Sequence, residues 1–542
     1  MGSKLRTSLP LTLASVLAIT ACAETGPLAP DARDTGLSPT LALHEASLQA
    51  TPAGFIRIGV VPSATSVRVG AAGDWIVRDK ATGATLLSGS GDAVTVRLLA
   101  AGEVRTRRWF QVTCSGSPST VADLVTRGQA AGFETLTEDL GFCTRVLFGS
   151  LPVGESAADR TAFVASLGAA GLPTAGGYWQ TKTVVSGESQ VEASYGDEER
   201  VANNPVVLES ADGIVLINGS PYRGVVEVWT NSGGTLAAIN ELPIEDYLYG
   251  VVPRELPPGP YGEPEAQKAQ AVAARTYALA NMGKRGADGY DLLTTTSDQV
   301  YGGVAAEHPV STAAVDATAN VVAVYNGTLI STLYHSTSGG FTANSEDVYA
   351  NPVAYLRGVP DAERGSALDH VPSLDVFMRH ANPTNLRARA EGDFEADWSI
   401  YHRWVVTWTL DEMAQALSSS FATTVTQVDS IVVTDRADHG RVRAIVFYTD
   451  AGALVGTKDG IRSRLPYFNA SGTLSSLRST LFFIEPWQER GAVVGWKAYG
   501  GGWGHGVGMS QTGAVEMAQR GRTYQEILAH YYQGSTTEVR TY

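Results

Sequence analysis

Cysteine and charge are both scarce in this 542-residue chain. It has three cysteines, and Asp, Glu, Lys and Arg together make up only 18% of the residues. Since 40 Lys and Arg stand against 55 Asp and Glu, the formal charge is −15 at pH 7. An acidic surface repels phosphates, which argues against a nucleic-acid partner. A hydrophobic content of 44% excludes a largely disordered chain, and the length allows roughly two to four domains.

The chain also has little that could cross a membrane. Its apolar stretch Leu9–Ile19, behind Lys4 and Arg6, is too short for a mature spanning helix. The stretch runs into Ala21-Cys22, and a small residue directly before a Cys resembles a bacterial lipoprotein cleavage site. We therefore expect residues 1–21 to be a lipoprotein signal peptide.

Lipid on Cys22 would then hold the protein at a membrane surface. Residues 22–50 are rich in Pro, Thr, Ala and Asp, which is typical of a flexible tether. The alternative is an ordinary secretory signal with a chance Cys, and both interpretations place the chain in the cell envelope or beyond. Ala23 is not the Asp of inner-membrane retention, so we expect the periplasmic face of the outer membrane where a cell has two membranes.

If Cys22 carries lipid, Cys114 and Cys143 are left. An even pair in an oxidising compartment suggests a disulfide between them. Two separate buried thiols are the alternative.

Short alternating apolar runs separated by turns predict an α+β fold, with a mainly antiparallel β-rich domain and a few helices. We divide the chain into a β-rich N-terminal segment at 51–104, a small α+β module at 105–180 and a large domain at 200–542. The early strands near 55–100 either stand alone or belong to the large domain. In the latter, the clearest predicted helix covers 263–283, and the last covers about 511–520.

The 105–180 module shows two strand–helix units. Strands are predicted at 108–112 and 144–149, and helices at 121–132 and 158–170. The run RVLFGSLPVGESAADRTAFVASLGAAGLP resembles the sporulation-related repeat (SPOR) domain, which implies binding to peptidoglycan glycan strands stripped of peptides. The alternative is an unrelated α/β insert.

Glu255 stands out among the carboxylates of the large domain. Pro253 and Pro257 flank it, which predicts irregular backbone at this position. Apolar neighbours that dehydrate a carboxyl group raise its pKa and keep a proton available for general acid catalysis. The alternative is an exposed loop Glu.

Three further stretches, 294–302, 334–347 and 500–511, place polar and aromatic side chains beside glycines. Glycine lets backbone approach a ligand closely. Such side chains with little net charge suit a sugar better than a phosphate or a metal. A tight turn in a β fold is the alternative for each stretch.

Taken together, these stretches resemble the stage II sporulation protein D family. The resemblance covers about 200–542 and is carried by six motifs in order: LPIEDYLYGVVP with Glu255, KAQAVAARTYAL, SDQVYGG, YHSTSGGFTANSEDVY, YLRGVPD and GGGWGHGVGMSQTGAVEMA. It implies a lytic transglycosylase that cleaves the MurNAc–GlcNAc β-1,4 bond of peptide-stripped strands and leaves 1,6-anhydro-MurNAc ends.

In this family the catalytic acid is the Glu of the Pro-x-Glu-Leu/Met-Pro motif, which corresponds to Glu255. We expect other motif residues to bind substrate or to hold Glu255: Arg275, Tyr277, Gln299, Tyr301, His335, Ser336, Ser338, His505 and Gln511. Some relatives are instead amidase enhancers, so a non-catalytic glycan-binding protein with a cell-wall amidase as partner is the alternative function.

Sporulation members hold zinc with His and Cys near the Gln-Val-Tyr motif. The corresponding residues 295–301 contain neither, and we find no other cluster with the spacing of zinc ligands. We therefore predict no metal and no cofactor.

Overall fold

In this computed structural model, the described residues are 54–542, apart from 116, 140–143, 187–188, 260, 364–369, 380–392 and 396–398. The signal peptide, the tether, Cys22 and Cys143 lie outside the described residues.

The strands between residues 55 and 100 and those between 190 and 243, with a short strand at 292–293, form one β-sandwich. Its two sheets bury alternating residues against each other, such as Ile56 and Ile58 from one and Val94 and Val96 from the other. The first sheet has the order β17-β1-β16-β15-β12-β3-β4 and the second β11-β10-β5-β2-β13-β14. The strands of the first sheet are β1 (Phe55–Ala64), β3 (Asp74–Asp79), β4 (Thr85–Ser90), β12 (Val206–Ser210), β15 (Val225–Thr230), β16 (Leu236–Pro243) and β17 (Leu292–Leu293). Those of the second sheet are β2 (Ser66–Gly70), β5 (Ala93–Ala100), β10 (Gln190–Tyr195), β11 (Glu198–Ala202), β13 (Ile214–Ile217) and β14 (Ser220–Arg223).

A small α/β module is inserted between β5 and β10, which are neighbours in the second sheet. It runs β6 (Glu103–Ser115), α1 (Pro118–Ala130), β7 (Glu134–Asp139), β8 (Thr144–Pro152), α2 (Ala157–Ala169) and β9 (Tyr178–Ser186). The sheet order β7-β8-β6-β9 with this βαββαβ sequence is the ferredoxin-like arrangement. Both predicted helices are confirmed, and the module has its own core around Phe110, Phe148 and Leu167. Cys114 is disulfide-bonded.

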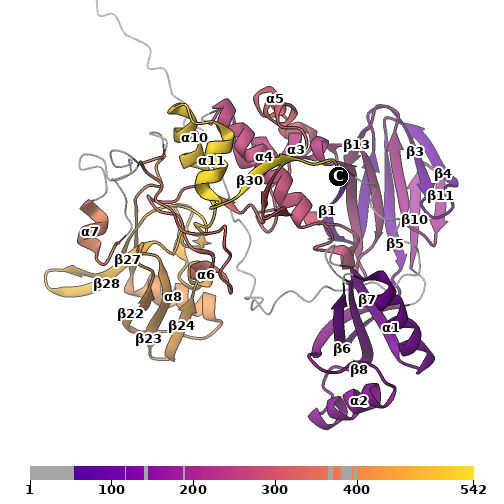
Figure 1. Cartoon of the computed structure of the whole chain (residues 1–542), viewed down its shortest axis with the longest axis horizontal. Helices are drawn as coiled ribbons and strands as arrows, with labels where there is room; N and C mark the ends of the chain where they lie inside the picture. The colour runs from indigo at the N-terminus through magenta and orange to yellow at the C-terminus, as the bar shows by residue number, and fades with distance from the viewer. Residues whose placement is uncertain are drawn as a thin grey trace, which may run out of the picture.

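Helices form the centre of the molecule, between the sandwich and the C-terminal unit (Figure 1). The helices are α3 (Ile244–Glu255), α4 (Pro264–Ala280), α5 (Pro309–Ala317), α6 (Ser345–Val348), α10 (Gln511–Gln519) and α11 (Tyr524–Tyr531), with 3-10 turns η1 (Gly286–Asp288) and η2 (Val304–Ala306). Short strands accompany them: β18 (Val321–Tyr325), β19 (Thr328–Leu329), β20 (Tyr334–His335), β29 (Met509–Ser510) and β30 (Thr536–Val539).

The irregular backbone predicted around Glu255 is wrong, because α3 continues through Pro253 and ends at Glu255. Five apolar residues at helical spacing lie buried on one face: Ile244, Tyr247, Leu248, Val251 and Val252. A proline inside a helix costs about 3 kcal/mol. Burying an apolar side chain contributes about 1.5–3 kcal/mol, so the packing of this face outweighs the proline.

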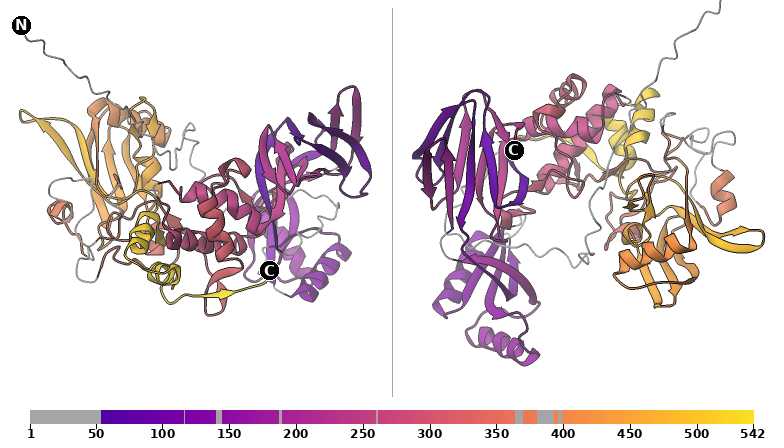
Figure 2. Two further views of the ribbon diagram at one scale, coloured as in Figure 1. Left: turned by 90° about the horizontal axis from the view of Figure 1, so that it is seen from above. Right: turned by 180° about the vertical axis from the view of Figure 1, so that it is seen from behind.

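The C-terminal unit has a separate core that includes Trp408, Leu417, Phe447 and Phe482. Its elements are α7 (Leu374–Arg379), β21 (Trp404–Thr409), α8 (Leu410–Phe421), β22 (Val428–Arg436), β23 (Val442–Thr449), β24 (Gly452–Thr457), α9 (Gly460–Arg464), β25 (Tyr467–Phe468), β26 (Leu474–Ser475), β27 (Phe482–Glu489) and β28 (Ala492–Gly500). The hairpin β27–β28 extends away from the rest of the unit (Figure 2).

The α+β fold is confirmed, with mainly antiparallel sheets. The prediction that the last helix is the one at 511–520 is wrong, because α11 follows α10. A capping box of Thr523 and Glu526 starts α11, and Ile527, Leu528 and Tyr531 are buried on it. Within the described ranges, no helix is long and apolar enough to span a membrane.

Gly250 tests how α3 is held. A Cβ at this position would lie 2.6 Å from the Tyr301 ring, so we expect Gly250→Ala to lower stability by about 1–3 kcal/mol, although Ala favours helices. Gly168→Ala in α2 is the control, because a Cβ there meets nothing within 4 Å. Calorimetric midpoints should fall for the first variant and stay or rise for the second. An unchanged midpoint for Gly250→Ala would show that the Tyr301 ring is not packed on α3.

Candidate active site

Glu255 ends α3 and is held by groups from three distant segments. The backbone N–H of Val300 donates to its Oε1 at 2.6 Å, and the Tyr334 hydroxyl makes a hydrogen bond with the same carboxyl group. The Nε2 of Gln511 donates to the Glu255 backbone carbonyl at 2.8 Å. These contacts fix both the main chain and the side chain of Glu255.

Burial raises the pKa of Glu255 to about 7. The hydrogen bonds from Val300 and Tyr334 and the charge of Arg254 act in the opposite direction, but they do not offset the loss of water. A carboxyl group with this pKa is protonated in a large fraction of molecules at neutral pH and can serve as a general acid.

A chain of buried side chains leads to the Tyr334 hydroxyl. The Tyr247 hydroxyl donates to Oε1 of Gln299 at 3.3 Å, and Nε2 of Gln299 donates to the Tyr334 hydroxyl at 3.0 Å. Because the Tyr334 oxygen accepts from Gln299, its own hydrogen is available for Glu255. Burial and the Glu255 charge raise the pKa of Tyr334 well above its ordinary value, so it stays a neutral donor.

Glu255 opens into a cavity of about 630 Å³ between the central helices and the C-terminal unit. The sides of this cavity come from α4, from the loop at 296–298, from β20, from α9 and from the glycine-rich stretch at 503–505. Gly504 is needed for this closeness, since its φ is +108° and a Cβ would lie 2.8 Å from the Cβ of His335. Glycine in this stretch therefore brings the backbone against the pocket, as expected from the sequence.

The cavity collects six of the ten residues expected at the site from the sequence: Glu255, Tyr277, His335, Ser336, His505 and Gln511. The rings of His335 and His505 lie side by side, with centroids 5.7 Å apart. Residues from four different motifs therefore meet at one place.

The other four predicted residues do not line the cavity. Gln299 lies behind Tyr334, as described above. The Tyr301 hydroxyl donates to Oδ1 of Asn240 at 3.0 Å under α3.

Arg275 is fully buried, and its Nε and Nη2 donate to the Glu245 carboxylate at 2.8 and 2.6 Å. Ser338 is buried against Asp361, whose pKa is raised to about 7 by burial and by the nearby Glu395. Arg275 and Ser338 therefore stabilise the structure around the cavity and do not line it.

Sequence reasoning missed several lining residues: Asn281, Lys284, Thr296, Ser297, Asp298, Tyr334, Tyr349, Asp459, Arg462 and Trp503. Nζ of Lys284 donates to Oδ1 of Asp298 at 2.6 Å and to the Tyr277 hydroxyl at 3.3 Å. Asp298 and Tyr334 lie inside the sequence motifs given above, so their place in these motifs could have identified them as site residues. Asp459 and Arg462 of the α9 region lie outside every motif.

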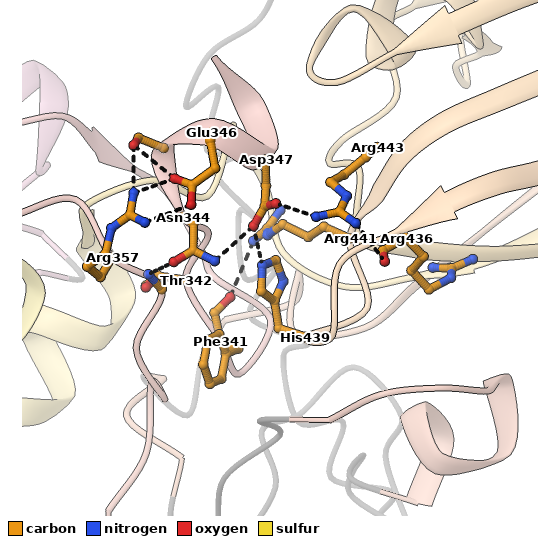
Figure 3. A network of polar contacts seen from close by, with 12 residues as sticks. Phe341, Thr342, Asn344, Glu346, Asp347, Arg357, Arg436, His439, Arg441 and Arg443 are labelled. Atoms are coloured by element: carbon orange, nitrogen blue, oxygen red, sulfur yellow. Dashed lines mark hydrogen bonds and ion pairs between the residues drawn. The ribbon is translucent and has the colours of Figure 1, made fainter. Parts of the chain in front are cut away.

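A network of ion pairs attaches the pocket loops to the C-terminal unit (Figure 3). The carboxylate of Asp347 on α6 accepts from Asn344 and His439, both at 3.0 Å, and from Arg443 at 3.1 Å. Burial alone would raise the pKa of Asp347, but these donors hold it well below its ordinary value. Nη2 of Arg441 adds a bond to the Ser338 carbonyl at 2.9 Å. The loop after His335 is therefore fixed to the β22–β23 hairpin.

In the part of the chain that the structure describes, no group of three or more His, Cys, Asp or Glu side chains is arranged to hold a metal ion. The absence of a metal stays a prediction.

Comparisons with known proteins identify the family of this chain. Residues 232–325 match the stage II sporulation protein family, and residues 343–508 match a domain of unknown function, DUF8618. An uncharacterized protein of Brachyspira hyodysenteriae is 31% identical over 62% of this chain and 77% of its own length. Stage II sporulation protein D of Bacillus amyloliquefaciens is 29% identical over 55% of this chain and 74% of its own length. The amidase enhancer of Bacillus subtilis is 29% identical over 53% of this chain and 40% of its own length.

The fold and the pocket define a β-rich α+β protein with one dehydrated carboxyl group at a helix end. The chain belongs to the stage II sporulation protein D family.

The pKa of Glu255 has a consequence for stability. A carboxyl group whose pKa is raised in the folded state, from 4.5 to about 7, contributes stability below pH 4.5 that is lost as the pH rises through 7. Glu255→Gln should therefore raise the thermal midpoint relative to wild type at pH 8 but not at pH 4. The exposed Glu489→Gln variant is the control, and its midpoint should not differ from wild type at either pH. An equal effect of Glu255→Gln at both values would contradict the dehydration of the carboxyl group.

Proposed function

We propose that this protein acts on the cell wall as a lytic transglycosylase of peptidoglycan glycan strands. The observation that carries the proposal is the dehydrated Glu255 carboxyl group at the cavity, held by Val300 and Tyr334, with a pKa of about 7. The lining combines hydroxyl, amide, imidazole and aromatic groups, which suit sugar hydroxyls and acetamides, with the charged side chains of Lys284, Asp298, Asp459 and Arg462.

The proposed reaction uses one residue twice. Protonated Glu255 donates its proton to the oxygen between MurNAc C1 and the 4-position of GlcNAc, and the C1–O bond breaks through an oxocarbenium-like state. The 6-hydroxyl of the same MurNAc then attacks C1 and gives its proton to the Glu255 carboxylate. The products are a 1,6-anhydro-MurNAc end and a free GlcNAc 4-hydroxyl. Glu255 is protonated again, and no water is consumed.

The carboxylates at the cavity favour this mechanism over hydrolysis. Hydrolases need a second carboxylate as nucleophile or base. The Asp298 side chain is fully buried and paired with Lys284 and Arg285, so it is poorly placed for attack. Asp459 is the remaining lining carboxylate, and it lies 3.4 Å from Nη1 of Arg462. An intramolecular hydroxyl needs no second carboxylate and gains from proximity.

The amidase enhancer among the relatives supports a second candidate function, a glycan-binding protein that assists a cell-wall amidase. Intact Glu255 in its dehydrated position favours the enzyme.

The remaining parts of the proposal concern placement. We propose that lipid on Cys22 anchors the protein at the periplasmic face of an outer membrane, which the mass of the N-terminal peptide from cells would test.

We also propose that the 105–180 module is SPOR-like and binds glycan. Its ferredoxin-like order supports an α+β module of this kind, and glycan binding by a chain without residues 103–186 would test the role.

The decisive experiment incubates the mature chain, begun after Cys22, with peptide-free glycan strands and analyses the products by mass spectrometry. Wild type should give 1,6-anhydro ends, and Glu255→Gln should lower the rate by at least about 100-fold, since a general acid contributes 10²–10⁴.

Two outcomes would contradict the proposal. Ends that have gained one water would indicate a hydrolase, and their loss in Asp459→Asn would identify the second carboxylate. Binding of glycan without cleavage by wild type would support the enhancer function.

The pH profile tests the role of Tyr334. Its hydrogen bond lowers the pKa of Glu255, so Tyr334→Phe should raise that pKa further. The acid must be protonated, so the alkaline limb of kcat/KM should move to higher pH in this variant. Tyr249→Phe is the matched control, because the Tyr249 hydroxyl donates to Asp316, outside the cavity, at 2.7 Å. If the alkaline limb of kcat/KM does not move in Tyr334→Phe, then Tyr334 does not contact Glu255.

A further inference from the structure

The backbone of Val507 contacts both histidines of the cavity, one through each of its polar groups. Nδ1 of His335 lies 3.2 Å from the Val507 carbonyl oxygen. The Val507 N–H points to Nδ1 of His505 at 3.0 Å. Val507 is fully buried, so water does not compete for these contacts.

These two contacts require opposite tautomers. A carbonyl oxygen only accepts, so Nδ1 of His335 must carry a hydrogen, and a neutral His335 ring then has a bare Nε2. A backbone N–H only donates, so Nδ1 of His505 must be bare, and the hydrogen of that ring is on Nε2.

The surroundings keep both rings neutral. Burial lowers the pKa of His505 to about 4 and lowers the pKa of His335 well below its ordinary value. Arg441 acts on both rings and Arg462 on His505, and each opposes a further positive charge. Asp459 favours a charge on His505 but does not offset the burial.

The acceptor on His335 has no partner. Its Nε2 is buried and makes no hydrogen bond to any of the described residues. His335 lines the cavity, and only 4% of its surface is exposed. An unpaired buried acceptor is unfavourable, and a ligand that supplies a donor relieves this. A carboxylate cannot do so, since it has no hydrogen to give at neutral pH.

We propose that one hydroxyl group of the glycan bridges the two histidines, donating to Nε2 of His335 and accepting from Nε2 of His505. This inference rests on the proposed glycan substrate. A hydroxyl group both donates and accepts, and rings with centroids 5.7 Å apart are close enough for one oxygen atom at their edges to be within hydrogen-bond distance of both. The pair is a specificity device that selects a neutral hydroxyl over an anionic group.

The test uses substitutions that keep the contact with Val507 and remove the cavity nitrogen. In His335→Asn the side-chain amide can still donate to the Val507 carbonyl, and in His505→Asn the amide oxygen can still accept from the Val507 N–H. His308→Asn is the matched control, because Nδ1 of His308 accepts from the N–H of Val310, two residues on, in the same way. His308 is exposed and does not line the cavity.

Each variant is made in the Glu255→Gln background, which is expected to bind without cleavage, and titrated with peptide-free glycan strands by calorimetry. We expect affinity to fall about three- to ten-fold for His335→Asn and for His505→Asn, as for loss of one hydrogen bond, and to stay unchanged for His308→Asn. If the parent binds and the first two variants bind equally well, the hydroxyl bridge is wrong while the proposed function stands. If the parent does not bind glycan, both are wrong.

A second measurement reads the tautomers of the two rings directly in the wild-type chain. Nitrogen-15 NMR of the histidine rings in the wild-type chain, assigned by difference from the variants, should show hydrogen on Nδ1 of His335 and on Nε2 of His505 at pH 7. The same tautomer for both rings, or an imidazolium, would overturn the inference.

Discussion

The central packing of this molecule keeps one carboxyl group, that of Glu255, partly out of water. Glu255 is dehydrated because α3 is held rigidly against the sandwich by an apolar face and because Gly250 lets the Tyr301 ring lie against the helix. The backbone next to Tyr301 then directs the Val300 N–H to Oε1 of Glu255. The packing of a structural tyrosine and the position of a hydrogen bond to Glu255 are therefore one constraint. A change in the first is transmitted directly to the second.

The polar residues around the cavity divide by what they touch. His335, Ser336 and His505 face the space that a ligand would fill, whereas Gln299 and Arg275 act one layer behind it. The parallel pairing of β20 with β29 unites the motifs at 334–338 and 500–511, which are far apart in the chain. Buried polar networks of this kind are costly when incomplete, and Nε2 of His335 is one buried atom without a partner among the described residues.

Sequence reasoning located Glu255 and the glycine-rich approach of backbone to the pocket, because each leaves a local pattern of residue types. It misjudged the backbone at Glu255 because the prolines were weighed without the apolar spacing from Ile244 to Val252. Asp459 and Arg462 leave no pattern at all, since they reach the cavity only through packing of the C-terminal unit on the central helices. Arg275 could not be told from a binding residue in advance, because its partner Glu245 comes from another helix.

The module between β5 and β10 enters and leaves the sandwich at two strands that are hydrogen-bonded to each other. Its removal or replacement therefore requires only a short connection, and neither sheet order nor the position of Glu255 depends on it. Evolution can exchange such an insert as a unit, so the module and the pocket are free to change at different rates. Relatives with the same pocket and a different module, or with none, are what this architecture allows.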